Sequence, residues 1–103
     1  MGDFRKTRDP KLRREILYLL HLDKRYNLTL GMLKDALNDR MISVSRNEVE
    51  YQLQWLEDHR LVTITRNGDT IFGATLTDEG KDVVTGDSMV TGVQRPQPGD
   101  LAE

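Results

Sequence analysis

A change of hydrophobic period past the middle of the chain constrains the fold more than any other feature of these 103 residues. In residues 45–59 the apolar side chains recur three and four positions apart, which is typical of an amphipathic helix. Residues 61–65 and 70–76 are instead rich in β-branched side chains and alternate, as strands do. Asn67-Gly68 between them is the strongest short-range signal for a β-hairpin. The sequence therefore predicts a helix followed directly by a two-stranded hairpin.

The predicted helix over residues 45–59 has the clearest start signal in the chain. Ser45 and Glu48 fit a capping box, in which the hydroxyl and the carboxylate each accept an otherwise unpaired backbone N–H. Val44 and Val49 suit the hydrophobic staple that accompanies such a box. We therefore expect this helix to have a fixed start and to bury its aliphatic side.

Three further helices are expected, two before this helix and a short one after the hairpin. Asp9-Pro10 is typical of an N-cap followed by Pro at the first helical position. Asn27 is the expected left-handed residue after the first helix, and Thr29 and Thr77 can cap the other two. The expected ranges are 10–26, 30–37 and 78–84.

One domain is expected from a chain of this length. Residues 1–8 are polar and are predicted to be a flexible N-terminus ahead of a domain over residues 9–84. Residues 85–103 contain Gly and Pro at short intervals and are predicted to be an extended tail. The tail has apolar residues expected to lie against the domain or against a partner, namely Met89, Val90 and Val93. The apolar pair Met41-Ile42 is expected to tuck into the core.

Composition excludes several kinds of site. The chain has no Cys, so a disulfide framework and a thiolate zinc site are excluded. His21 and His59 lack metal-ligand spacing, and the sequence has no phosphate-binding loop or nucleophile elbow. We expect no enzyme activity, cofactor or metal. We also expect no membrane segment and no secretory signal, hence a cytoplasmic protein of a bacterial host.

Charge is distributed unevenly along the chain. Residues 1–66 carry 13 basic and 10 acidic side chains, whereas residues 67–103 carry 2 and 7. Six basic residues lie close together near the N-terminus, namely Arg5, Lys6, Arg8, Lys11, Arg13 and Arg14. One interpretation is that they contact phosphates, and the other is that they only keep the start of a helix solvated. The isoelectric point near 5.7 argues against indiscriminate nucleic-acid binding but leaves room for a local basic patch.

The order of predicted elements is that of a winged helix-turn-helix. The fold class is therefore expected to be mainly α with a small β-hairpin: three helices, a two-stranded wing and a short C-terminal helix. In such proteins the third helix enters the major groove and the wing contacts the backbone or the minor groove.

Several segments resemble those of a small protein family of Mu-like bacteriophages and prophages. They are residues 26–28, 44–49, 55–57, 61–63 and 74–77, together with the tail segment 90–99. The resemblance implies a winged-helix fold similar to ArsR-type regulators. Similar sequences place Gly where this chain has Arg60, which implies that Arg60 takes a positive φ at the end of the third helix.

The predicted DNA-contacting residues lie on the polar side of the third helix and at the hairpin turn. They are Ser45, Arg46, Asn47, Glu50, Tyr51, Gln54, Arg66 and Asn67. Arg suits guanine edges and phosphates, and Asn suits adenine. An ordinary solvated helix with an Arg46–Glu50 ion pair, and an ordinary polar turn, explain the same residues without DNA.

Two functions follow from these expectations. The first is a phage or prophage transcription regulator that reads double-stranded DNA, as a homodimer where one copy makes too few contacts. The alternative is a winged-helix module that binds a phage or host protein in assembly, packaging or host-factor control. The acidic net charge and the position of Glu50 favour this alternative.

Overall fold

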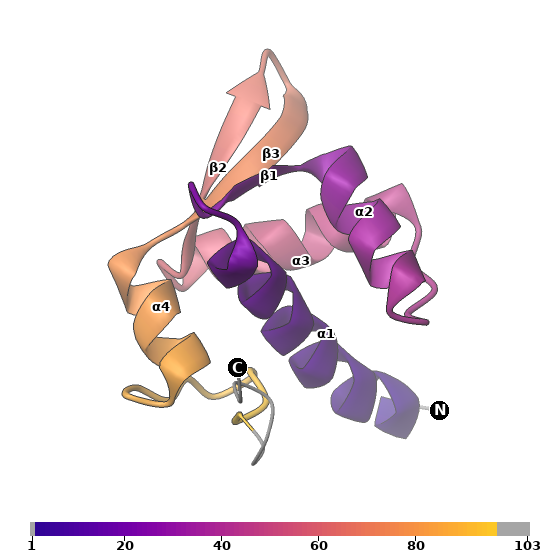
Figure 1. Ribbon diagram of the computed structural model, residues 1–103. Coiled ribbons are helices and arrows are strands. Elements are labelled where there is room, and N and C mark those ends of the chain that lie inside the picture. The colour runs from indigo at the N-terminus through magenta and orange to yellow at the C-terminus, as the bar shows by residue number, and fades with distance from the viewer. Residues whose placement is uncertain (1, 97–103) are drawn as a thin grey trace.

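The computed structural model describes residues 2–96, with side chains described from residue 8 onward. Within this range the chain forms four helices and a three-stranded antiparallel sheet, a mixed α and β architecture. The helices gather on one side and the hairpin projects away from them (Figure 1). The elements are α1 (Gly2–Leu22), β1 (Asn27–Thr29), α2 (Leu30–Asp39), α3 (Arg46–Asp58), β2 (Val62–Asn67), β3 (Thr70–Leu76) and α4 (Asp78–Thr85).

The sheet has one strand more than the predicted two. Its order is β1-β3-β2, with Leu28 and Ile64 flanking Ala74 from the two sides. β1 is only three residues long, too short to show an alternating pattern in the sequence. Its close approach to β3 depends on Gly73, because a Cβ there would lie 2.5 Å from the carbonyl oxygen of Leu28.

Both predicted ends of the first helix are wrong. α1 begins at Gly2, so Pro10 lies inside the helix and residues 2–8, expected as a flexible segment, are helical. The helix ends at Leu22, and Tyr26 rather than Asn27 takes the left-handed conformation, with φ of 58°. An Asp-Pro pair marks a helix start only when the preceding residues leave the helix, and here they continue it.

The core lies where α1, α2 and α3 pack against one another and against the sheet. Each element contributes the apolar side of its own periodic pattern. Fully or almost fully buried members include Leu12, Ile16, Leu20, Leu33, Leu37, Val49, Leu53, Leu56 and Leu76. None of the helices in residues 2–96 is long and apolar enough to cross a membrane.

Met41 departs from the prediction that it tucks into the core together with Ile42. Ile42 is half-buried against the core, but Met41 is 92% exposed. The chain reverses direction after α2 with Met41 at φ of 67°, and this left-handed residue turns its side chain outward.

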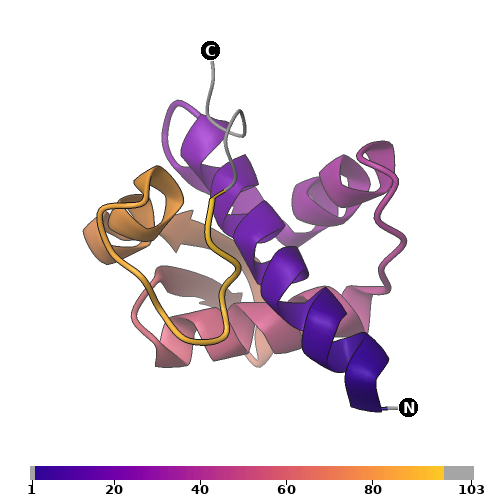
Figure 2. The same cartoon turned by 90° about the horizontal axis from the view of Figure 1, so that it is seen from below.

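The segment after α4 lies across α1 and α3 (Figure 2). Val93 is buried, Val90 packs against the core and Met89 remains 65% exposed. The backbone N–H of Gln94 donates to the carbonyl of Pro10 at 3.1 Å. Part of the predicted tail is therefore packed against the domain, while its residues 97–103 lie outside the described chain.

Candidate functional site

The start of α3 is fixed by the predicted capping box. The Glu48 backbone N–H donates to the Ser45 hydroxyl, and the Ser45 backbone N–H donates to the Glu48 carboxylate, both at 3.1 Å. At the other end Arg60 takes a φ of 64°, as the family resemblance implied. These two features define the ends of α3, and its amphipathic period determines which side chains face the solvent.

The side of α3 that faces away from the core carries most of the residues predicted to contact DNA. Val49, Leu53 and Leu56 are completely buried on the inner side. On the outer side Arg46, Asn47 and Gln54 are exposed, Tyr51 is 57% exposed and Glu50 is half-buried. We call the outer set of Asn47, Glu50, Tyr51 and Gln54 the polar face of α3.

Arg46, at the edge of this face, pairs with an acid one turn later. Its Nε lies 3.5 Å from Oε2 of Glu50, which is the i,i+4 pair that the sequence offered as the alternative to DNA contact. More than half of the Arg46 side chain is exposed, so the pair is weak.

Arg66 lies against α3 instead of pointing freely from the hairpin. Its guanidinium donates to Glu57 of α3 at 2.9 Å, and Glu57 also accepts the backbone N–H of Ile64 at 3.0 Å. The hydrogen bond from Arg66 lowers the pKa of Glu57, and the same contact raises the pKa of Arg66. Asn67 pairs with Thr70 beside the turn and is exposed. The hairpin is therefore joined to α3 at Arg66, one residue before Asn67.

Of the N-terminal basic residues whose side chains are described, Arg13 is buried and is not part of a solvent-facing phosphate-binding surface. Arg13 is only 8% exposed and donates to Gln52 of α3 at 2.7 Å and to the carbonyl of Gly92 at 3.0 Å. Its guanidinium also lies 3.9 Å from the ring centroid of Trp55, and burial lowers its pKa.

Of the other basic residues in this group, Arg8 pairs with Glu48 and Arg14 pairs with Glu15, while Lys11 is exposed. The side chains of Arg5 and Lys6 lie outside the described part. The partner of Arg8 was missed because Glu48 lies on α3, and no local spacing in the sequence predicts a contact between the two helices.

Comparison with known proteins relates the chain to a bacteriophage protein. No family model matches the chain, and no solved structure matches it. Over 68 residues it is 40% identical to the uncharacterized protein gp26 of Escherichia phage Mu. The aligned part spans 66% of this chain and 70% of the phage protein. The chain therefore belongs to the family of phage Mu gp26.

Proposed function

We propose that the chain is a winged helix-turn-helix protein that binds double-stranded DNA through α3 and regulates transcription of a phage or prophage. Support for the fold comes from the order of α1, α2 and α3, followed by a projecting hairpin and α4 (Figure 1). In this arrangement α3 is the recognition helix and the β2–β3 hairpin is the wing. The family relationship supports the phage context.

The polar face of α3 is the observation that carries this proposal. Asn47 and Gln54 are exposed amides on one side of a helix whose opposite side is buried. An α-helix fits the major groove of B-DNA, and amide side chains make paired hydrogen bonds to adenine there. Tyr51 between them offers a hydroxyl that can donate to a phosphate.

The ion pairs of Arg46 and Arg66 are compatible with phosphate binding. Both arginines have about half of their side chains exposed, at 55% and 45%. Exposed ion pairs contribute little to stability, so a phosphate can replace the carboxylate at small cost. DNA binding then requires the ion pairs Arg46–Glu50 and Arg66–Glu57 to break.

An NMR titration with a duplex of mixed sequence at low salt tests the proposal. We expect backbone amide shifts to cluster on residues 45–54 and 66–69. Asn47→Ala and Gln54→Ala should each weaken binding to a selected site about tenfold, because a good amide–adenine pair contributes roughly 1–3 kcal/mol. Asn38→Ala is the matched control, since Asn38 is an exposed amide on α2.

Removing the competing acids should have the opposite effect. Glu50→Gln should strengthen binding, because Arg46 loses its intramolecular partner and the repulsion of phosphate falls. Glu79→Gln changes an exposed carboxyl on α4 and should leave affinity unchanged. Shifts scattered outside α3 and the hairpin, or equal effects of both Glu variants, would count against the assignment.

A homodimer is part of the same proposal. One recognition helix reads few base pairs, and paired half-sites supply the rest of the specificity. Sedimentation of the chain with a palindromic duplex should show two copies bound. A strict one-to-one complex at saturation would remove this part of the proposal.

Charge balance favours a second candidate function, a module that binds a phage or host protein in assembly, packaging or host-factor control. The surface formed by α3 and the hairpin carries Arg46 and Arg66, against the acids Glu50, Glu57, Asp58 and Asp69. A surface with more acids than bases is unfavourable for DNA. This candidate predicts that duplex DNA causes no shifts on α3 at any salt concentration.

A further inference from the structure

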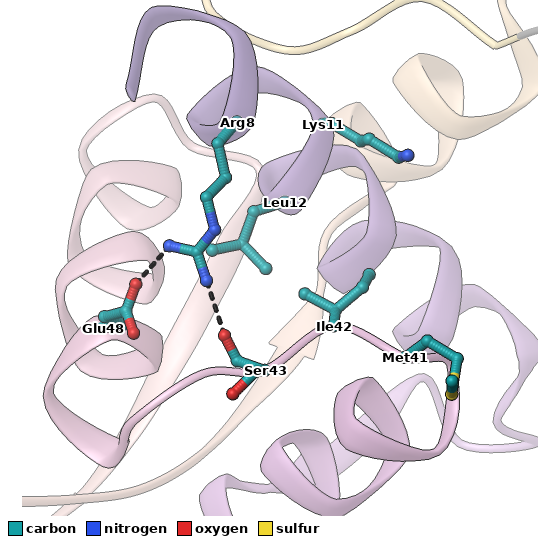
Figure 3. Close-up of a pocket in the computed structure, with 7 residues that line it drawn as sticks. All are labelled: Arg8, Lys11, Leu12, Met41, Ile42, Ser43 and Glu48. Atoms are coloured by element: carbon teal, nitrogen blue, oxygen red, sulfur yellow. Dashed lines mark hydrogen bonds and ion pairs between the residues drawn. The ribbon is translucent and has the colours of Figure 1, made fainter. Parts of the chain in front are cut away.

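A cleft away from the polar face of α3 has no role in DNA reading as proposed above. It lies between the N-terminal half of α1, the loop after α2 and the first turn of α3 (Figure 3). It is open to solvent and has a volume of about 560 Å³. Its lining includes Arg8, Lys11, Leu12, Met41 and Ile42. This volume is within the usual range for binding sites.

The floor of the cleft is apolar. Leu12 is buried at its base and Ile42 is half-buried beside it. Met41 stands at the rim, and its left-handed backbone holds the side chain 92% exposed. Met41 therefore adds an apolar contact surface beside this floor, against which an aliphatic side chain can pack.

The rim of the cleft is basic. Arg8 crosses one side, where it donates to Glu48 and to the carbonyl of Ser43 (Figure 3). Lys11 is exposed and takes part in no ion pair within the described residues. A neighbouring hollow shares Lys11, Met41 and Ile42 with the cleft and adds Arg14, Arg40 and Glu15.

The two hollows together carry more positive than negative charge. Their four cations are Arg8, Lys11, Arg14 and Arg40, and their carboxylates are Glu15 and Glu48. Glu15 is buried, and its carboxylate accepts from Arg14 at 2.8 Å and from Arg40 at 2.6 Å. Glu48 is bound by Arg8. Both acids are thus neutralised locally, and the remaining field attracts an anionic group.

We propose that this cleft docks an acidic segment of a partner protein that carries an aliphatic anchor. The anchor side chain packs on Leu12 and Ile42 beneath Met41, and flanking carboxylates pair with Lys11 and Arg40. The apolar floor argues for a peptide rather than for a phosphate backbone, which has no apolar side chain to bury there. The surface is separate from the polar face of α3, so this inference does not depend on DNA binding.

A synthetic peptide of sequence EDLEELLEDA tests the proposal with the full chain. Backbone amide shifts should cluster on residues 8–15 and 40–48. Lys11→Glu and Met41→Asp should each weaken the peptide at least threefold, and neither changes a buried side chain. Lys24→Glu and Met89→Asp are matched controls, being exposed residues of the same types outside the cleft. Both controls should stay within twofold of the parent chain.

Two altered peptides test the apolar contact and the charge contact separately. A version with alanine in place of leucine and a version with lysine in place of the acids should both lose binding. Equal binding of either version would overturn the proposal, as would shifts outside the cleft. Duplex DNA that shifts the same cleft residues and displaces the peptide would assign the surface to phosphate instead. Tighter binding by a chain lacking residues 97–103 would assign the cleft to that segment of the chain itself.

Discussion

Arg13 connects three segments that are far apart in the sequence. Its guanidinium binds Gln52 of α3 and the carbonyl of Gly92, and it stacks on the ring of Trp55. The charge is buried but has hydrogen-bond acceptors and an aromatic face around it, which is the condition for a buried cation to be tolerated. The segment around Gly92 is therefore held to the domain by a charged side chain as well as by the apolar Val93.

Gly92→Ala tests this attachment. Gly92 has a φ of 102°, and an added Cβ would lie 2.6 Å from the Trp55 ring. The strain and the clash should lower the free energy of unfolding by roughly 2 kcal/mol or more. Urea unfolding followed by Trp55 fluorescence measures the loss. Gly86→Ala is the control, because Gly86 has a φ of 87° but open space around it, and should cost about 1 kcal/mol. Equal losses would show that the Trp55 contact does not matter.

Glu48 and Glu57 make stability depend on pH. The hydrogen bond from Arg8 lowers the pKa of Glu48, and the one from Arg66 lowers the pKa of Glu57. The folded chain therefore binds these protons less readily than the unfolded chain. Their contribution is present above the unfolded pKa of about 4.3 and is lost as the pH falls through the lowered folded values.

The corresponding experiment compares unfolding at neutral and acid pH. Glu48→Gln and Glu57→Gln should each lower stability at pH 7 and flatten its decline toward pH 3, since glutamine does not titrate. Glu79→Gln on α4 serves as the control and should follow the parent chain. If a variant with both substitutions lost stability toward pH 3 as steeply as the parent chain, groups other than Glu48 and Glu57 would be responsible for the acid sensitivity.

At the scale of elements, local signals in the sequence predicted α3 and the hairpin well. The capping box of Ser45 and Glu48 is formed, and the β2–β3 hairpin forms where it was predicted. Its two turn residues are Gly68 and Asp69, one position later than the expected Asn67-Gly68, with Gly68 at φ of 65° and Asn67 paired with Thr70. β1 was missed because its pairing depends on the close approach at Gly73, which no local pattern encodes. Signals within a few residues of each other were thus reliable, and those that need a distant partner were not.

In the candidate site too, contacts within one helix were predicted and contacts between elements were not. The helical period placed Asn47 and Gln54 on the solvent side, and the i,i+4 spacing gave the Arg46–Glu50 pair. The ion pair between Arg66 and Glu57 of α3 was not predicted, because it depends on how the hairpin packs against the helix. Spacing predicts contacts along one helix, whereas contacts between elements need the tertiary arrangement.

Ser45→Ala tests the contribution of the cap to α3. The substitution removes the hydroxyl that accepts the Glu48 backbone N–H and should lower the free energy of unfolding by about 1 kcal/mol. Thermal unfolding monitored by circular dichroism gives this value. Ser43→Ala, in the same loop, changes a serine outside the cap and should be nearly neutral. A neutral Ser45→Ala would mean that packing alone fixes the start of the helix.

At the scale of the whole molecule, the surface of α3 and the hairpin differs in charge from the cleft beside α1. The surface of α3 and the hairpin has two arginines, each paired with an acid. The cleft beside α1 and the hollow next to it have Lys11, which takes part in no ion pair among the residues that the structure describes. They also have three arginines that share two acids, with Arg8 bound to Glu48 and both Arg14 and Arg40 bound to Glu15. The net charge of −2 therefore describes neither of these surfaces by itself.

The salt dependence of the proposed DNA binding tests whether the phosphates contact α3 and the hairpin or the cleft beside α1. Binding through α3 and the hairpin engages Arg46 and Arg66, so log K against log salt should have a slope of about −2 for each copy. Arg46→Ala and Arg66→Ala should each reduce the magnitude of that slope by about 1, because each phosphate contact releases about one counterion. Lys11→Glu should leave the slope unchanged. A steep slope that Lys11→Glu reduces, with no effect of Arg46→Ala, would instead place the phosphates in the cleft beside α1.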